Sequence, residues 1–463
     1  DDEFVVEDVT TGDELTTDFD EQDTGDYEFN FSVEDTDAEA SDSITIEAAD
    51  EAELSLNQSG VDVASGDTAE IQIDFQETSE GYIHIGDADV GYNVTAIVID
   101  DDEDGMANVT INTYGPTGSN NYGISTEDDD TDIEEAEVAD FDGDNDGDED
   151  VGDWNFGIDS DEPLDAGNYD IEVGTNELES PDAVGTLAVT EPTLQAAQPW
   201  VTFPDAEDDI EDGDDVLDAI EDGDLTQQDE IAEDDYVVVQ LQGSGWYGWY
   251  ANQDADDATP FGDVESDDGS DDDEQPVDLT IQEANPGPNQ EGVEIDKSAI
   301  SIIADDERDN FFLVFEADSS NVVTEQDSPD EDLPSNFEFD EARWNATLEL
   351  NDEGSLNDAN SDERITTRFS TVERDVELNT NADDNVEVAS SEDAEITGTT
   401  TIAPNSEVTV RARSASGAED PFVQSQTVNV SSDGTFNASF DFSDRAVGTN
   451  FTVTLSASPN FGD

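Results

Sequence analysis

The stretch at residues 140–154, DFDGDNDGDEDVGDW, places a carboxylate at almost every second position. Counted from Asp142, acidic residues occupy positions one, three, five, seven, nine and twelve of a loop, and Gly147 occupies position six. These acids are Asp142, Asp144, Asp146, Asp148, Asp150 and Asp153. Alternate side chains converge on one ion when the backbone wraps around it, and a midpoint glycine permits the sharp turn. The spacing therefore predicts a site for calcium or another hard cation, with a backbone carbonyl contributed near Asp148.

Two features favour a different interpretation of this loop. Position twelve is an aspartate and not the longer bidentate glutamate, and no helical pattern flanks the loop. A solvated acidic turn that holds cations diffusely remains the alternative. A second, weaker match is DDDEDG, which contains Asp100, Asp102 and Asp104 and lies between two apolar strand patterns. For that segment a plain hairpin turn is the favoured interpretation.

The sequence also contains eight N-x-S/T acceptor sites for N-linked glycans. They are Asn30, Asn57, Asn93, Asn108, Asn345, Asn429, Asn437 and Asn450. A chain rich in Ser and Thr forms such triplets by chance, so their number alone is weak support. As a set they predict a glycosylated protein outside the cell, with the last three asparagines on exposed positions.

The remaining chemistry-bearing residues do not form a catalytic set. His84 is the only histidine, cysteine is absent, and no phosphate loop, nicotinamide fingerprint or zinc motif occurs. Carboxylate pairs are abundant, but nothing singles out a pair for acid–base work. The aromatic group Trp246, Tyr247, Trp249 and Tyr250 suits either sugar stacking or buried packing, of which packing is favoured. We expect no enzyme.

The overall charge identifies the solvent in which these groups must work. The 463 residues contain 130 Asp and Glu against nine Lys and Arg, for a net charge of −121. Self-repulsion of that size prevents folding in dilute buffer, whereas at about 1 M salt the Debye length falls to about 3 Å. The composition predicts an extremely halophilic protein that avoids nucleic acid. Lys297 is the first basic residue of the chain.

The apolar pattern is that of half-buried strands. Segments such as DYEFNFSVED, AEIQIDF and FTVTLSAS alternate apolar and polar residues, and Gly, Asp, Asn and Ser clusters bound them. One stretch, DDVLDAIEDGD, has a helical period, with Asp214 as the expected cap, Gly223 as its end, and Val216, Leu217 and Ile220 as its apolar face. The fold class predicted is all-β: tandem immunoglobulin-like β-sandwich domains with one short helix in the third unit.

Four units follow from the spacing of strands and turns. Residues 1–49 hold about three strands, a partial immunoglobulin-like piece with too few strands for a sandwich. We expect either that the missing strands lie upstream in a longer precursor or that a neighbouring chain or domain completes the sheet. Residues 50–192 predict a β-sandwich with acidic ion-binding loops. Residues 193–392 predict a larger, mainly β domain that contains the helix. Residues 393–463 predict a C-terminal immunoglobulin-like module.

Three runs carry a resemblance to a known group of proteins. They are LDAGNYDIEVG at 164–174, DVLDAIEDGDLTQQDEIAEDDYVVVQLQGSGWYG at 215–248, and the segment from TTIAPNSEVTVRARS to FTV at 400–453. The chain resembles haloarchaeal BGTF surface-domain proteins, which are related to surface-layer glycoproteins. That resemblance implies secretion, a β-rich extracellular body, glycosylation and a structural role in the cell envelope.

These observations rank the possible functions. The first is a structural cell-surface glycoprotein of an extreme halophile that forms or decorates a surface layer and is stabilised by cations. The second is the subunit of an extracellular filament or sheath, assembled by strand sharing between neighbours. The third is an adhesin or carbohydrate-binding protein, and a secreted hydrolase is a distant fourth. The expected partners are further copies of the chain, cations and N-linked glycans. No segment is apolar enough to span a membrane.

Overall fold

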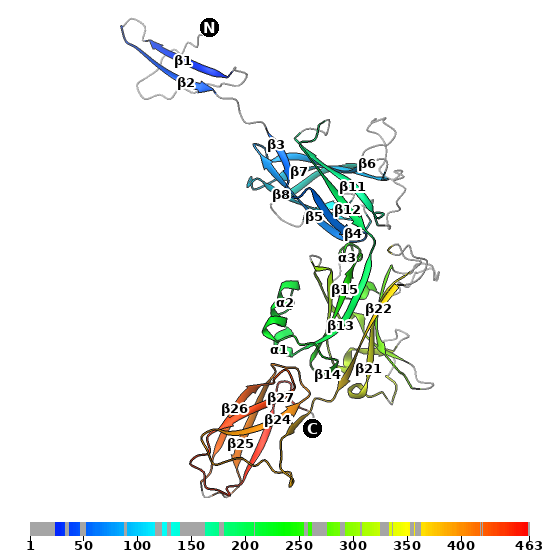
Figure 1. The fold of residues 1–463 in the computed structure, drawn as a ribbon, viewed down its shortest axis with the longest axis vertical. Helices are drawn as coiled ribbons and strands as arrows, with labels where there is room; N and C mark the ends of the chain where they lie inside the picture. The colour runs from blue at the N-terminus through cyan, green and yellow to red at the C-terminus, as the bar shows by residue number, and fades with distance from the viewer. Residues whose placement is uncertain are drawn as a thin grey trace.

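The computed structural model describes most of the chain in separate stretches. The described residues are 24–32, 37–46, 52–87, 90–115, 123–126, 131–138, 163–175, 180–207, 209–253, 258–261, 276–287, 292–305, 308–324, 333–335, 337–351, 356, 363–416, 418 and 420–461. The calcium loop predicted at 140–154 lies outside them. Figure 1 shows β-sheet units that follow one another along the long axis in chain order. The all-β tandem fold class is confirmed.

The N-terminal piece contains one described hairpin. Strand β1 (Gly25–Ser32) pairs antiparallel with β2 (Glu39–Ile46), and Tyr27 lies opposite Ile44. Alternating residues place Tyr27 and Ile44 on one face of this two-stranded sheet and Asp26 and Thr45 on the other. A two-stranded sheet is marginally stable by itself, so the expectation that a partner completes it stays a prediction.

The second unit is a β-sandwich of a four-stranded and a six-stranded sheet, in the orders β3-β5-β8-β9 and β10-β7-β6-β11-β12-β4. The strands are β3 (Glu53–Leu56), β4 (Gly60–Ala64), β5 (Thr68–Gln76), β6 (Glu80–Asp87), β7 (Tyr92–Asp100), β8 (Met106–Asn112), β9 (Ile124–Ser125), β10 (Thr131–Val138), β11 (Gly167–Gly174) and β12 (Ala183–Thr190). The inward residues of both sheets, such as Ile73, Ile85 and Val109, form one buried core. The period-two pattern is thus explained by one packed face per sheet.

The third unit, from β13 to β22, packs two sheets and adds helices. Its sheet orders are β13-β15-β19-β18 and β14-β22-β21-β16-β17-β20. The strands are β13 (Thr193–Thr202), β14 (Glu230–Ala232), β15 (Tyr236–Ser244), β16 (Val277–Glu283), β17 (Val293–Ile295), β18 (Ser301–Asp305), β19 (Asn310–Glu316), β20 (Val322–Thr324), β21 (Arg343–Leu350) and β22 (Glu363–Val372). The helices are α1 (Pro204–Glu207), α2 (Gly213–Asp222) and α3 (Tyr247–Ala251), with short 3-10 turns η2 (Thr259–Phe261), η3 (Lys297–Ala299), η5 (Ser319–Asn321) and η6 (Phe339–Glu341).

The sheet that contains β19 is buried on both faces. Phe311, Leu313 and Phe315 enter the main core between the sheets, whereas Phe312 and Val314 form a second cluster with Val216 of α2. This double burial explains why β19 reads as the continuous apolar run FFLVF and not as an alternating strand.

The predicted helix exists, but two of its details were wrong. Asp212, and not Asp214, is the N-cap, since its side chain accepts hydrogen bonds from the backbone N–H groups of Asp214 and Asp215. Gly223 ends the helix in a left-handed conformation at φ 81°, as expected. Leu217 is 42% exposed and so does not belong to the buried face. The structure adds the short helices α1 and α3 to the one that was predicted.

The C-terminal module is a sandwich of two three-stranded sheets, β23-β24-β27 and β26-β25-β28. Its strands are β23 (Val376–Leu378), β24 (Ala394–Thr400), β25 (Glu407–Ser414), β26 (Val423–Asn429), β27 (Thr435–Phe440) and β28 (Phe451–Ser456). The sequence placed β23 in the third unit, but β23 pairs with β24. This module therefore includes residues from 376 onward, and not only 393–463.

Candidate functional site

The acidic turn at residues 100–105 connects the two sheets of the second unit. It follows β7, which belongs to the six-stranded sheet, and precedes β8, which belongs to the four-stranded sheet. The hairpin interpretation of this turn is therefore wrong. The carboxylate oxygens of Asp100, Asp102 and Asp104 lie within 4.8 Å of one another, and Asp100 is buried whereas the other two are exposed.

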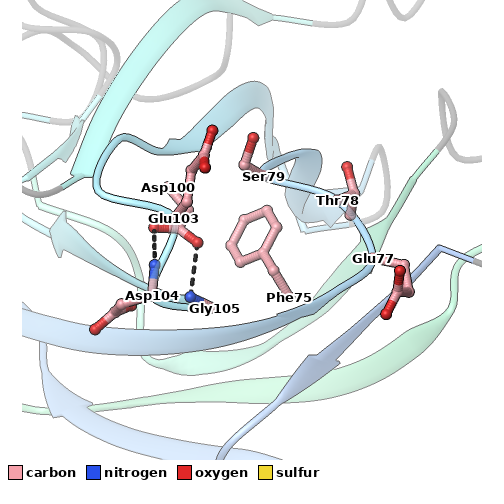
Figure 2. Close-up of a pocket in the computed structure, with 8 residues that line it drawn as sticks. All are labelled: Phe75, Glu77, Thr78, Ser79, Asp100, Glu103, Asp104 and Gly105. Atoms are coloured by element: carbon pink, nitrogen blue, oxygen red, sulfur yellow. Dashed lines mark hydrogen bonds between the residues drawn. The ribbon is translucent and has the colours of Figure 1, made fainter. Parts of the chain in front are cut away.

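Hydrogen bonds within the turn hold Asp100 in place. Its carboxylate accepts from the backbone N–H of Gly105 at 2.8 Å and of Asp104 at 3.3 Å. Figure 2 shows these bonds beside a pocket lined by Phe75, Glu77, Thr78, Ser79, Asp100, Glu103, Asp104 and Gly105. The carboxylates of Asp102 and Asp104 also accept backbone N–H groups, from Asp104 at 3.2 Å and from Met106 at 2.9 Å. Three carboxylates this close together suit a hard cation.

A second carboxylate group was not predicted from the sequence. Asp234, Glu316 and Asp318 come from segments about eighty residues apart and also bring oxygens within 4.8 Å of one another. Burial raises the pKa of Glu316, and the nearby carboxylates of Asp318 and Asp234 raise it further. These three carboxylates come close together only in the folded chain, so their spacing in the sequence could not have identified the group.

A buried aspartate joins the second unit to the third. Asp67 is 7% exposed, and its two carboxylate oxygens accept from the backbone N–H groups of Gly245 at 2.7 Å and Tyr247 at 2.8 Å. The backbone N–H of Gly248 donates to the carbonyl of Gly66 at 2.8 Å. Burial raises the pKa of Asp67 to about 7; the charge of Asp309 adds to the rise, and the backbone hydrogen bonds oppose it.

Glycines allow the two backbones to meet closely at this first junction. A Cβ atom on Gly248 would lie 2.2 Å from the side-chain oxygen of Asn112. One on Gly66, whose φ is +96°, would lie 2.1 Å from the carbonyl oxygen of Gly245. The side-chain amide of Asn112 also donates to the Gly248 carbonyl at 2.9 Å. Because β12 and β13 are separated only by residues 191 and 192, the junction has little freedom.

A similar arrangement joins the third unit to the C-terminal module. Asp235 is fully buried; one of its oxygens lies 2.5 Å from Nη1 of Arg374, and the other accepts from the backbone N–H of Ala403 at 2.6 Å. Arg374 also donates to the carbonyls of Glu233 at 3.0 Å and Pro459 at 3.3 Å. Burial raises the pKa of Asp235 to about 6, and Arg374 opposes that rise. Sequence reasoning missed both junction aspartates.

The aromatic group lies within a core, as the favoured interpretation predicted. Trp246 and Trp249 are each 1% exposed, and they pack in the main core of the third unit with Phe261 and Phe311. Three of the four residues of the aromatic group belong to the short helix α3. A pair of buried indoles offers no face for stacking a sugar, so this group gives the adhesin alternative no support.

His84 lies on β6, where its Nδ1 is 2.8 Å from the hydroxyl oxygen of Thr95 on the neighbouring strand β7. Burial lowers the pKa of this histidine, although Glu172 and Asp87 oppose that effect. An imidazole that faces a threonine across a strand pair is ordinary sheet packing. The position of His84 thus supplies no argument for catalysis.

The eight glycan acceptor sites separate into two groups. Exposed asparagines are Asn30, Asn57, Asn429, Asn437 and Asn450; half-buried ones are Asn93, Asn108 and Asn345. The half-buried residues lie within strands β7, β8 and β21, and the side-chain amide oxygen (Oδ1) of Asn93 is buried. The expected exposure of Asn429, Asn437 and Asn450 is confirmed.

Comparisons with known proteins cover nearly the whole chain. Residues 46–176 match a family described as a domain of unknown function, DUF7827. The chain is 30% identical over 427 residues to a cell surface glycoprotein of Haloferax gibbonsii, covering 91% of this chain and 45% of that protein. It is 32% identical over 476 residues to cell surface glycoprotein 1 of Haloarcula hispanica, covering 97% of this chain and 48% of that protein. The chain spans about half the length of these relatives.

Among solved structures, surface layer protein SbsC, domains 4–9, superposes on this chain with a TM-score of 0.20 and 10% sequence identity. The match covers 77% of this chain and 36% of that one, and a likeness this weak carries no argument. Within the part of the chain that the structure describes, no helix has both the length and the apolar character to cross a membrane. Sequence identity alone thus relates the chain, over nearly all of its length, to the cell surface glycoproteins of halophilic archaea.

Proposed function

We propose that this chain is the structural body of a cell-surface glycoprotein of an extreme halophile, and that it forms or decorates an extracellular surface layer. In this role the protein acts as a spacer and a contact surface, not as a catalyst. The similarity to cell surface glycoproteins supports a location at the cell surface, because the sequence identity extends over at least nine tenths of the chain.

The observation that carries the proposal is the pair of junctions. Each junction uses a buried aspartate that accepts a backbone N–H from the neighbouring unit, as Asp67 does from Gly245 and Asp235 does from Ala403. Exposed ion pairs are weak and are screened in brine, whereas buried hydrogen bonds are screened much less. Such contacts keep successive sandwiches in a fixed relation, which a structural layer needs and an isolated binding module does not.

The finer parts of the proposal concern ions, sugars and assembly. Hard cations would neutralise the carboxylates at Asp100, Asp102 and Asp104 and in the predicted loop at 140–154, and glycans would occupy the exposed acceptor sites. Copies of the chain would assemble as a two-dimensional layer, or as a filament if hairpin β1–β2 were completed by a neighbour. A layer and a filament differ in symmetry, since a filament repeats along one axis.

Electron microscopy of a haloarchaeon that produces the protein tests this function. Immunogold label on intact cells should cover the cell surface evenly, and isolated envelopes should show a two-dimensional array. Label confined to the cytoplasm would refute the surface role. Label along isolated fibres would retain the surface location and select the filament alternative.

A further inference from the structure

The few basic residues of this protein are unevenly distributed. All nine occur from Lys297 onward, in a chain with 130 acids. Most of those that the structure describes already have acidic or polar partners. Arg308 pairs with Asp214 and Asp305, Arg374 with Asp235, and Arg445 with Asp420. Arg343 on β21 and Arg411 and Arg413 on β25 make no ion pair with a described residue, and the last two lie together on one exposed strand face.

These two arginines lie on the outward face of the sheet β26-β25-β28. In β25 the inward residues Val408, Val410 and Ala412 are buried, and the alternate residues Arg411 and Arg413 are exposed. Within the described part of the chain neither arginine makes an ion pair, although Arg364 on another sheet pairs with Glu349 at 3.9 Å. Both arginine side chains therefore lie on the exposed face of this sheet.

The neighbours of these arginines are uncharged. Arg411 lies opposite Ser425 on β26 and Thr454 on β28, and Arg413 lies opposite Val423 and Thr452. The register completes this face with Glu407, Thr409, Thr427, Asn429 and Ser456. Glu407 is its one carboxylate, and it lies four residues along the strand from Arg411. In a protein with net charge −121, this three-stranded surface carries net positive charge.

The chemistry of the face selects a carboxylate-bearing partner. Arg forms two parallel hydrogen bonds to a carboxylate and is more weakly hydrated than Lys, so it can pair with an acid at contact distance where salt screens longer-range attraction. The surrounding Ser and Thr hydroxyls can hydrogen-bond the same acidic partner. The exposed Val423, at 52%, adds apolar area beside Arg413.

We propose that the outward face of β26-β25-β28 is a docking surface for the acidic surface of a second copy of this chain. The inference rests on the proposed function in one respect: copies of the protein must stand side by side on the cell. Within a layer each copy is surrounded by surfaces rich in Asp and Glu, and this face meets them without charge repulsion. An anionic glycan offers similar charge, and the experiment below distinguishes it.

The size of the face predicts the strength of the contact. Eight residues at about 3.4 Å each and three strands about 4.8 Å apart give a face of about 27 Å by 14 Å. This is about half of the roughly 800 Å² per partner found in a standard stable interface. We therefore expect weak association of the free protein, detectable at high concentration and multiplied in an array by many simultaneous contacts.

Sedimentation equilibrium of the full chain in molar salt tests the proposal. The wild-type protein should self-associate reversibly, and the double variant Arg411→Gln, Arg413→Gln should raise the dissociation constant at least tenfold. The control variant Arg364→Gln, Arg368→Gln makes the same charge change on exposed residues of β22 and should stay within twofold of wild type. Unchanged circular dichroism would show that both variants remain folded.

Three outcomes would overturn the docking surface. The first is a wild-type protein that stays monomeric up to about 1 mM. The second is an equal effect of the two double variants on the dissociation constant. The third is self-association that disappears when glycans are removed; each of these would exclude a protein contact at this face. Surface labelling of cells that produce the Arg411→Gln, Arg413→Gln variant separates the two proposals. If the variant reaches the cell surface but associates like wild type, this inference fails and the structural surface role stands.

Discussion

At the scale of single residues, Asp67 makes the first junction sensitive to pH. Burial raises the pKa of this carboxyl from 3.8 to about 7, and the backbone hydrogen bonds from Gly245 and Tyr247 oppose the rise. The joined state therefore binds the proton more tightly than the separated state, so this contribution to stability is complete below about pH 4 and is lost as pH rises through 7. We expect the junction to weaken by up to about 2 kcal/mol between pH 5 and pH 7.

Hydrogen exchange of the Gly245 and Tyr247 amides, followed from pH 5 to pH 8 and corrected for intrinsic rates, measures this opening. Asp67→Asn should abolish the pH dependence that Asp67 contributes, whereas Asp62→Asn, on the exposed face of β4, should retain it. The same pH dependence in Asp67→Asn as in wild type would contradict the assignment.

The predicted calcium loop gives a second test at residue scale. Changing Asp144 and Asp146 together to Asn should lower the calcium bound per chain in molar monovalent salt, since two of the converging ligands lose their charge. Isothermal titration and chelation measure the effect. The paired changes Asp271→Asn and Asp272→Asn in the acidic stretch 266–274 are the control, and equal results would reduce the loop at 140–154 to a dense acidic patch.

Residue-scale function was the hardest part to predict from this sequence. Asp67 and Asp235 are two acids among 130, and what distinguishes them is burial against residues 178 and 168 positions away. No local spacing encodes such contacts. The acidic turn at Asp100 was found by its spacing, but its position between two sheets depended on a pairing that the sequence did not show.

At the scale of elements, prediction succeeded where one face of a strand is buried and failed where tertiary contacts decide. Strands such as β5 and β28 were recognised because more buried and more exposed residues alternate along them. The continuous run in β19 carries no such period, and the cap of α2 was misplaced by two residues because several aspartates precede the helix. Strand β23 pairs with β24 at a distance along the chain, so composition alone could not assign it to the last module.

The close approach of backbones at the first junction gives a test of that interface. Gly248→Ala places a methyl group 2.2 Å from the side-chain oxygen of Asn112, so we expect it to weaken the junction by about 1–3 kcal/mol without unfolding either sandwich. Small-angle scattering should then show a broader distribution of maximum dimensions. Gly60→Ala, where no atom lies within 4 Å of the new Cβ, should leave scattering unchanged. If the Gly248→Ala protein kept the wild-type distribution of maximum dimensions, the close approach of Gly248 to Asn112 would not be what holds the two units together.

Strand burial also predicts which acceptor sites carry glycans. Asn429, Asn437 and Asn450 should be modified because they are exposed, and Asn93, Asn108 and Asn345 should remain bare because strand neighbours half-bury them. Glycopeptide mass spectrometry of protein from a haloarchaeal host measures occupancy at each asparagine. Modification of Asn93 with no modification of Asn437 would reverse this expectation.

At the scale of the whole molecule, the charge of −121 determines where the protein folds. Lowering salt from molar to about 10 mM lengthens the Debye length from about 3 Å to about 30 Å, so carboxylates across the surface repel one another. We expect dialysis into dilute buffer without divalent ions to abolish the β-sheet circular dichroism signal. A cooperative thermal transition that persists in dilute buffer would refute the halophilic interpretation.

The parallel strand pairs at the ends of the two larger units have a mechanical consequence. The last strand of the second unit, β12, pairs in parallel with the early strand β4, and the last strand of the third unit, β22, pairs in parallel with β14. Tension along the chain pulls an exiting strand lengthwise past its parallel neighbour. The hydrogen bonds between them then bear the force together, in shear, and do not open one after another. In the structural role proposed above, a pull transmitted between neighbouring units would thus be opposed in each unit at the strand from which the chain leaves.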